Sequence, residues 1–344
     1  MPISPDQNLS IDYSLLRDMP CLLAFSHGVD STALFYLLRE KGIRCDLAFV
    51  HYGLRAQADR EEAAARKLAE DHGLRIFVAR APYWKSGFER HAREYRYRFF
   101  EEIIEQEGYR TLLTAHQLND RLEWLMMRLG RGAGAVELAG LRAVEERRTS
   151  GGKRYRLVRP LLETSRQQLQ AYLDQKGCEY FIDESNESME NERAGIRMLC
   201  RDYVEAHREG IRRTFRYLNM DRAALEECWK LLFAFKGLRV YRLTDPGCAS
   251  RAADEGLKTL GYLLSASERE LIDRGESLVA GRMWAVERYG SHLYIAPYLV
   301  DETLPKKFRE ACREAKIPPK IRPYCYREKI SINELIGKIA KDNR

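Results

Sequence analysis

The sequence lacks the paired cysteines that mark structural zinc or iron–sulfur sites. Its 8 cysteines are scattered through the 344 residues, and none stands in a Cys-x-x-Cys pair. We therefore expect reduced, mostly buried thiols. The chain also lacks an apolar run near the ~20 residues of a membrane span, and residues 1–10 lack the basic and apolar regions of a secretory signal. We expect a cytoplasmic protein that does not enter a membrane.

The excess of positive over negative side chains is also small. Lys and Arg (58) outnumber Asp and Glu (51) by 7, which does not separate a nucleic-acid-binding protein from one with an ordinary basic surface. Apolar residues make up 45% and charged residues 32%, so wholesale disorder and fibrous architecture are excluded.

The first half of the chain alternates short apolar runs with helix-like stretches. The runs cover residues 21–25, 47–50, 76–79, 111–115 and 155–158, and the helical patterns cover residues 31–40, 59–71, 89–107 and 120–129. Alternation of this kind is typical of βαβ units around a parallel sheet that is covered on both faces. The sequence predicts an α/β fold with a Rossmann-like, doubly wound parallel sheet.

The sharpest motif is a loop between the first strand and the first helix, with the sequence Phe-Ser-His-Gly-Val-Asp-Ser over residues 25–31. Unpaired backbone N–H groups and the positive end of the helix dipole suit phosphate at such a place. Ser31 can donate to a phosphate oxygen, and Asp30 can hold Mg²⁺ or cap the helix. An ordinary turn with an aspartate cap is the alternative interpretation. The candidate nucleotide-binding residues are Ser26, His27, Gly28, Val29, Asp30 and Ser31.

This loop resembles the S-G-G-x-D-S loop of the N-type ATP pyrophosphatases, also called the PP-loop family. These enzymes cleave ATP between its α- and β-phosphates, so the resemblance implies ATP and Mg²⁺ as cofactors, with Asp30 as the metal ligand. His27 stands where the family usually has Gly, and His tolerates a positive φ less well than Gly.

Further motifs, in the same order over residues 20–200, resemble the tRNA(Ile)-lysidine synthase branch of that family. They lie at residues 50–55, 89–97, 114–123, 128–134, 159–162 and 183–197. The resemblance implies an adenine nucleotide alpha hydrolase-like fold. The chain departs from the family pattern at Tyr52, Gln117, Asn119, Arg121 and Ala194.

His116, Asp120 and Glu123 carry the predicted chemistry. Their i, i+4, i+7 spacing places them on one helical face, at the carboxyl end of the fourth apolar run, where ligands of open α/β sheets collect. Two carboxylates there can bind the ammonium group of lysine, and one can accept a proton from the attacking amine. The alternative is a solvated helix face on which these carboxylates pair with Arg121 or Arg128.

Arg93 and Arg193 complete the candidate catalytic residues. Arg93 and Arg96 can meet phosphate or RNA backbone. The alternative is a helix surface on which Arg93 pairs with Glu89, and the pattern favours this surface position for Arg96. Arg193 and Arg197 can reach the reacting centre, or they can be solvated charges of a basic helix.

The resemblance implies an ATP-dependent carbon–nitrogen ligase that acts on tRNA. Such an enzyme joins free L-lysine to the 2-carbon of the wobble cytidine in an isoleucine tRNA with a CAU anticodon, through an adenylated cytidine, and releases AMP and pyrophosphate. Isoleucine tRNA and lysine are thus the expected partners. A homodimer is one candidate assembly.

The pattern changes after about residue 160. Residues 165–176, 193–217 and 223–235 read as helices, residues 278–297 as a β-hairpin with a Tyr-Gly turn, and residues 306–316 as a basic helix. We predict a PP-loop domain over residues 1–205, a helical linker over residues 206–275 and a small basic α+β domain over residues 276–344. Residues 193–216 hold seven arginines against three acids, and residues 306–329 hold nine basic against three acidic side chains, so both can track tRNA phosphates.

Three other functions stay open on the sequence. A tRNA thiolase can use the same loop, but its chemistry normally recruits paired or cluster-binding cysteines. An amide-forming synthetase is a second alternative, although no glutaminase pattern is visible. A basic tRNA-binding protein with a degenerate, non-catalytic nucleotide fold is the third, because of the departures at His27 and elsewhere.

Overall fold

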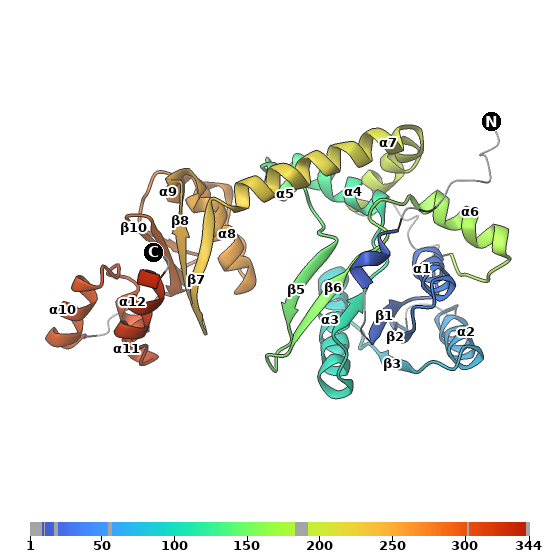
Figure 1. The fold of residues 1–344 in the computed structure, drawn as a ribbon, viewed down its shortest axis with the longest axis horizontal. Coiled ribbons are helices and arrows are strands. Elements are labelled where there is room, and N and C mark those ends of the chain that lie inside the picture. Colours follow the sequence, from blue (N-terminus) through green and yellow to red (C-terminus); the bar gives the residue numbers. More distant parts are fainter. Residues whose placement is uncertain are drawn as a thin grey trace. The chain divides into compact units, whose positions relative to one another are not determined.

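The computed structural model describes residues 9, 11–16, 20–53, 57–182, 192–300 and 303–341, without the side chains of residues 192–194 and 340–341. The chain divides into two compact units, Met1–Asn219 and Met220–Arg344. Figure 1 shows an α/β unit built from the first part of the chain and a second unit with its own sheet.

A six-stranded sheet with the order β3-β2-β1-β4-β6-β5 forms the centre of the first unit. Neighbouring strands run parallel, except that β5 pairs antiparallel with β6 at the edge. The strands are β1 (Cys21–Phe25), β2 (Cys45–His51), β3 (Ile76–Arg80), β4 (Thr111–Leu113), β5 (Val144–Arg148) and β6 (Arg154–Val158). The predicted runs are all strands, and β5 is an additional one.

Helices cover both faces of this sheet. Leu23 of β1 shares a buried core with Leu34 of α1 and Leu169 of α6, whereas its neighbour Leu22 shares another core with Phe100 of α3. Successive strand residues point to opposite faces, so each face has its own hydrophobic layer. The helices are α1 (Val29–Glu40), α2 (Gln57–Asp71), α3 (Phe88–Glu107) and α6 (Arg166–Lys176). The predicted Rossmann-like, doubly wound fold is confirmed (Figure 1).

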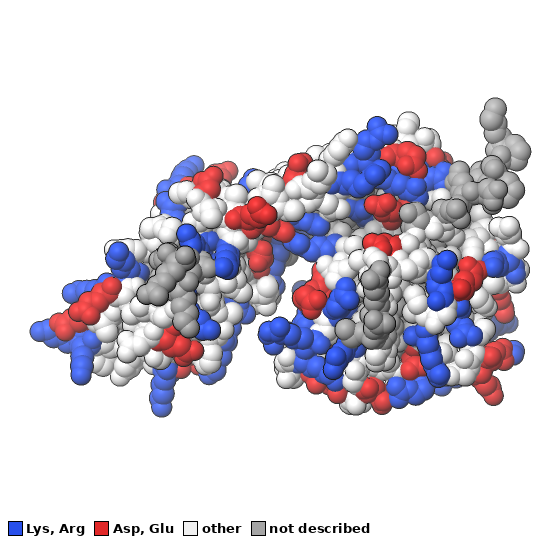
Figure 2. All heavy atoms as spheres, viewed as in Figure 1, with Lys and Arg blue, Asp and Glu red and all other residues white. Residues whose placement is uncertain are grey.

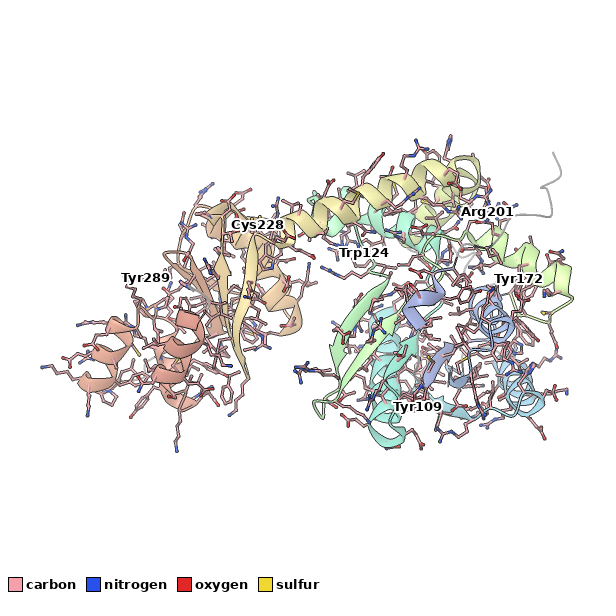
Figure 3. The ribbon with its side chains drawn as sticks, viewed as in Figure 1. Tyr109, Trp124, Tyr172, Arg201, Cys228 and Tyr289 are labelled. Atoms are coloured by element: carbon pink, nitrogen blue, oxygen red, sulfur yellow. The ribbon has the colours of Figure 1, made fainter. Side chains whose placement is uncertain are left out.

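Helix α6 is fixed against α1 by polar contacts as well as by the core. The Tyr172 hydroxyl donates to Glu40 Oε1 at 2.8 Å, and Figure 3 labels this tyrosine on α6. Ser165 caps the helix, and Gln168 completes the capping box by accepting the Ser165 N–H. The first residue of α6, Arg166, is thereby held at a defined place.

The strand order reverses beside β1, because β2 and β3 extend to one side of it while β4 and β6 extend to the other. At such a switch point the loops that leave two neighbouring strands turn to opposite faces and open a crevice at the carboxyl ends of the strands. The sheet therefore provides a ligand position between the ends of β1 and β4.

Two further helices and the start of a long one complete the first unit. They are α4 (Leu118–Leu129), α5 (Ala135–Leu138) and α7 (Glu192–Glu226), which is kinked at His207 (φ −125°, ψ 20°). Leu122 of α4 and Val204 of α7 belong to one buried cluster. Trp124 of α4 donates to the backbone oxygen of Glu137 at 3.2 Å (Figure 3).

The second unit is built on a five-stranded antiparallel sheet with the order β7-β8-β11-β10-β9. Its strands are β7 (Trp229–Phe235), β8 (Leu238–Leu243), β9 (Leu278–Ala280), β10 (Trp284–Tyr289) and β11 (His292–Pro297). Its helices are α8 (Ala249–Thr259), α9 (Ala266–Asp273), α10 (Lys306–Glu314), α11 (Arg322–Arg327) and α12 (Ile332–Lys341). The predicted hairpin is confirmed by the pairing of β10 with β11.

The structure differs from the predicted helical linker over residues 206–275. Strands β7 and β8 lie inside that range, and β8 joins the rest of the sheet by pairing with β11. The boundary between the two units falls after Asn219. The apolar run in residues 229–235 reads equally as a buried helix or a strand when it stands alone. Its pairing with β8 decides the matter, and β8 is in turn paired with β11, which begins about 50 residues later in the sequence.

The cysteines are free and mostly buried, as predicted. All eight cysteines are free thiols, and six of them are buried. Among the helices that the structure describes, none is both long enough and apolar enough to cross a bilayer.

Arg159 is the largest fully buried side chain of the described residues and ties β6 to its neighbour. Its Nη1 donates to the Arg142 backbone oxygen at 2.7 Å and to Glu145 Oε1 at 2.6 Å. Arg159→Ala is expected to lower the free energy of unfolding of the first unit by about 3 kcal/mol, because a buried carbonyl loses its donor and a void opens. Urea unfolding measures the change. The exposed Arg154→Ala on the same strand should stay within about 0.5 kcal/mol, and equal losses for the two variants would contradict this role for Arg159.

Candidate active site

A cavity of about 290 Å³ opens at the carboxyl ends of β1, β2 and β4, at the switch point of the sheet. It is lined by five residues of the predicted phosphate loop, by residues that follow β2 and β4, and by side chains of α3 and α6. The lining residues include Ser26, Gly28, Val29, Asp30, Ser31, Tyr52, Arg96, Tyr97, Phe100, Thr114, His116, Asp120, Arg166 and Phe181. The sequence-predicted loop, His116 and Asp120 thus meet at one cavity.

The loop folds around its own serines. The Ser26 N–H donates to Ser31 Oγ at 3.2 Å, and the Ser31 hydroxyl donates to the Gly28 backbone oxygen at 3.2 Å. Gly28 is the N-cap of α1, and no side chain caps the first turn of this helix. The N–H groups of that turn consequently point to the cavity end without a side-chain acceptor, which is the arrangement that binds phosphate elsewhere.

His27 lies behind the loop rather than in the cavity. Its backbone has φ 58°, so the position does require the left-handed conformation for which the family uses glycine. The imidazole is 3% exposed, with its ring centre 5.2 Å from those of both Phe25 and Phe181, and burial lowers its pKa. Of the six predicted nucleotide-binding residues, His27 alone is not among those that line the cavity.

Asp30, in the first turn of α1, has a carboxylate oxygen without a partner. Its Oδ1 is buried and accepts no hydrogen bond, while Oδ2 lies 3.9 Å from Arg166 Nη1. Burial raises the pKa of Asp30 to about 7, Arg166 opposes the shift, and the charges of Asp120 and Glu123 add to it. A cation bound here would give Asp30 Oδ1 a partner.

His116 lies on the turn between β4 and α4, and Asp120 lies in the first turn of α4. His116 precedes the helix, so the prediction of three residues on one helical face is wrong for it. Its Nδ1 is 3.0 Å from Thr114 Oγ1, and burial lowers its pKa, which keeps the ring neutral near pH 7. Asp120 Oδ2 accepts the Gln117 N–H at 2.9 Å in a capping box, and the Asp120 side chain reaches the cavity.

Glu123 and Arg93 do not line the cavity. Glu123 is 3% exposed, and its Oε1 lies 3.4 Å from Arg197 Nε of α7. Arg93 is exposed and packs over the Tyr97 ring at 5.0 Å. Arg96, for which the sequence favoured a surface role, lines the cavity instead. A helix rotates 100° per residue, so the sequence did not fix which arginine faces inward.

The departures from the family pattern have structural explanations. Gln117 caps α4 by accepting the Asn119 N–H at 2.6 Å, and Asn119 Oδ1 accepts the first N–H of α6 at 3.1 Å. The Arg121 guanidinium stacks over Phe215 at 3.9 Å. Tyr52 lines the cavity, and its buried hydroxyl has no hydrogen-bond partner. The side chains of Arg193 and Ala194, and the motifs at residues 54–55 and 183–186, lie outside the described residues.

Sequence reasoning missed Arg166 and Phe181 at the cavity. Phe181 joins the loop through a parallel bridge to Gly28, with the Phe181 N–H donating to the His27 backbone oxygen at 2.9 Å. Arg166 is the first residue of α6 and carries no local pattern that points to a ligand. The one signal was its capping box, Ser165 with Gln168, which marks the helix start but not the direction of the Arg166 side chain.

Comparisons with known proteins agree with this architecture. The PP-loop domain model matches residues 8–203. The tRNA(Ile)-lysidine synthase of Campylobacter jejuni is 38% identical over 325 residues, covering 94% of this chain and 97% of the relative, and that of Wolinella succinogenes is 43% identical over 317 residues, covering 90% and 94%.

Among solved structures, the U34-tRNA thiolase NcsA from Methanococcus maripaludis, with its [4Fe-4S] cluster, has a TM-score of 0.51 at 16% identity, covering 72% of this chain and 83% of that one. At this identity the likeness concerns the fold. The extent of the lysidine synthase matches and the loop at the switch point lead to one conclusion: the chain belongs to the tRNA(Ile)-lysidine synthase family of PP-loop proteins.

Proposed function

We propose that this protein is a tRNA(Ile)-lysidine synthase that uses ATP to join free lysine to the wobble cytidine of an isoleucine tRNA with a CAU anticodon. The observation that carries the proposal is that the phosphate loop, the vacant Asp30 oxygen, His116 and Asp120 lie at one and the same cavity. A nucleotide, a pyrimidine and an amine can meet at such a place.

In the first step the 2-carbonyl oxygen of the cytidine attacks the α-phosphorus of ATP, and pyrophosphate leaves. Negative charge grows on the departing phosphates, and we propose that the N–H groups at the start of α1 and the Ser31 hydroxyl stabilise it. The adenylated oxygen is a good leaving group. Reaction then continues at the 2-carbon of the same base.

In the second step the ε-amine of lysine attacks that carbon, and AMP leaves. The amine has an ordinary pKa near ~10.4 and must lose a proton before it attacks. Asp120 is our candidate for the base because it lines the cavity, and the neutral ring of His116 is our candidate for orienting the substrates. Holding two substrates side by side supplies much of the rate gain in a step of this kind.

The residues present fit a magnesium ion that is shared with the nucleotide. Mg²⁺ usually takes one or two protein carboxylates and completes its shell with phosphate oxygens and water. Asp30 offers the vacant carboxylate oxygen, and the described residues contain no cluster of three or more ligating side chains that would bind a metal without the nucleotide. When bound, the ion neutralises charge on the phosphates.

The tRNA requires a large basic surface. Lys and Arg side chains gather along α7 in Figure 2, and α10 begins a second basic stretch with Lys306 and Lys307. We propose that both contact tRNA phosphates, so that tRNA affinity falls as the salt concentration rises.

The proposal is tested by turnover with ATP, radiolabelled lysine and an isoleucine tRNA that carries a CAU anticodon. We expect lysine incorporation with release of one AMP and one pyrophosphate for each lysidine formed. The same tRNA with a GAU anticodon is the matched control and should incorporate none. Binding of the CAU tRNA without any incorporation would contradict the proposal and favour the non-catalytic alternative.

Sulfur transfer is the second candidate because the thiolase shares the fold. Six of the eight thiols in this chain are buried, and the described residues hold no group of cysteines that could bind a cluster. Formation of thiolated tRNA from a sulfur donor in the same assay would revive that candidate.

A further inference from the structure

The phosphate loop contains no positively charged residue. Residues 25–32 read Phe-Ser-His-Gly-Val-Asp-Ser-Thr, and burial keeps His27 neutral and away from the cavity. ATP brings several negative charges to a site that already holds the Asp30 and Asp120 carboxylates. Mg²⁺ on Asp30 offsets part of this charge, and a cationic side chain from another part of the fold can balance more of it at the β- and γ-phosphates.

Of the described residues that line the cavity, two are arginines, Arg96 and Arg166. Arg96 comes from α3, where its positive charge acts to lower the pKa of Tyr52 and that of His116. Arg166 comes from α6 and lies beside the loop, with its Nη1 3.9 Å from Asp30 Oδ2. The position of Arg166 beside Asp30, in the first turn of α1, suits the phosphates.

The backbone of Arg166 is fixed while its side chain is free to turn. Its N–H donates to Asn119 Oδ1 at 3.1 Å, and the capping box at Ser165 holds the start of the helix. The guanidinium is 38% exposed, and its distance to Asp30 is well beyond the ~2.8 Å of a strong charge-assisted hydrogen bond. Because this contact is long, an anion that makes shorter contacts can replace Asp30 as the partner of the Arg166 guanidinium.

We propose that Arg166 is the phosphate-binding cation of this enzyme: it pairs with Asp30 in the empty site and contacts the β- or γ-phosphate once nucleotide and metal occupy the loop. A metal ion on Asp30 removes the partner that holds the guanidinium, and the phosphates provide a bidentate one. The inference rests on the proposed function for its identification of ATP as the nucleotide.

Calorimetric titration with α,β-methylene-ATP and with AMP, both with Mg²⁺, tests the proposal. Arg166→Gln should weaken binding of the triphosphate analogue by about 10- to 100-fold, since a charge-assisted contact is lost. AMP, which lacks the β- and γ-phosphates, should bind within about twofold of the wild type. The affinity of Arg166→Lys for the triphosphate analogue should lie between those of the wild type and Arg166→Gln. Lysine keeps the positive charge but cannot make the bidentate contact of a guanidinium.

Lys176→Gln is the matched control. It removes a positive charge from the last turn of the same helix, where Lys176 pairs with Glu40, and it should leave both affinities unchanged. Unchanged triphosphate binding in Arg166→Gln, or equal weakening of both nucleotides, would overturn the proposal. If the selective loss is found while the wild type makes no lysidine, the proposed function fails and the role of Arg166 stands.

Discussion

Asp30→Asn is expected to reduce pyrophosphate release from ATP by about 1000-fold or more, while tRNA binding is retained. The carboxylate has a buried oxygen without a partner at the mouth of the phosphate loop, and the amide that replaces it is neutral and a poor ligand for Mg²⁺. Loss of charge stabilisation around a departing pyrophosphate costs several kcal/mol in the transition state. Release of labelled pyrophosphate in the presence of CAU tRNA measures the effect.

The substitution is nearly isosteric, so the fold should survive it. Asp71→Asn provides the control, because it removes a carboxylate from the surface of α2, where Asp71 pairs with Lys67. Filter binding of the tRNA should be the same for the wild type and both variants. Pyrophosphate release at the wild-type rate from Asp30→Asn would remove Asp30 from the metal role.

Asp120→Asn is expected to lower lysidine formation by about 100-fold or more, with a smaller effect on pyrophosphate release. Asp120 lines the cavity, and its removal as a base leaves the lysine amine protonated at neutral pH. Asparagine still offers an oxygen to the Gln117 N–H, so the cap of α4 is preserved. Single-turnover experiments that follow adenylated tRNA and lysidine separately distinguish the two steps.

Glu123→Gln should cost less, on the order of tenfold, because Glu123 acts through its pairing with Arg197 and does not line the cavity. Raising the pH should partly restore lysidine formation in Asp120→Asn, since more of the lysine is then unprotonated. A larger loss in Glu123→Gln than in Asp120→Asn would assign the base to the other carboxylate.

The loop and the sheet were predictable because their signals are local. A short apolar run, a Ser/Gly turn and an aspartate at the start of a helix lie within about ten residues, and alternating runs and helices leave few topologies open. The sequence left open whether residue 27, where the family usually has glycine, needs a positive φ, and the structure has φ 58° at His27.

The side chains that face the cavity depended on contacts between distant segments. His116 and Asp120 meet the loop only because β4 pairs with β1, and Arg166 reaches Asp30 across 136 positions of sequence. Rotation about a helix axis separated Arg96 from Arg93. The pairing of β7 with β8, and of β8 with β11, made residues 229–235 and 238–243 strands rather than helix.

The sequence by itself thus determined the family, the phosphate loop and the alternation that builds the parallel sheet, because short-range hydrogen bonding and hydrophobic periodicity fix these features. Tertiary structure alone decided which carboxylate and which arginine enter the site, and that residues 229–243 form strands of the second unit's sheet. Those choices depend on the packing of elements far apart in the chain, and no local pattern encodes that packing.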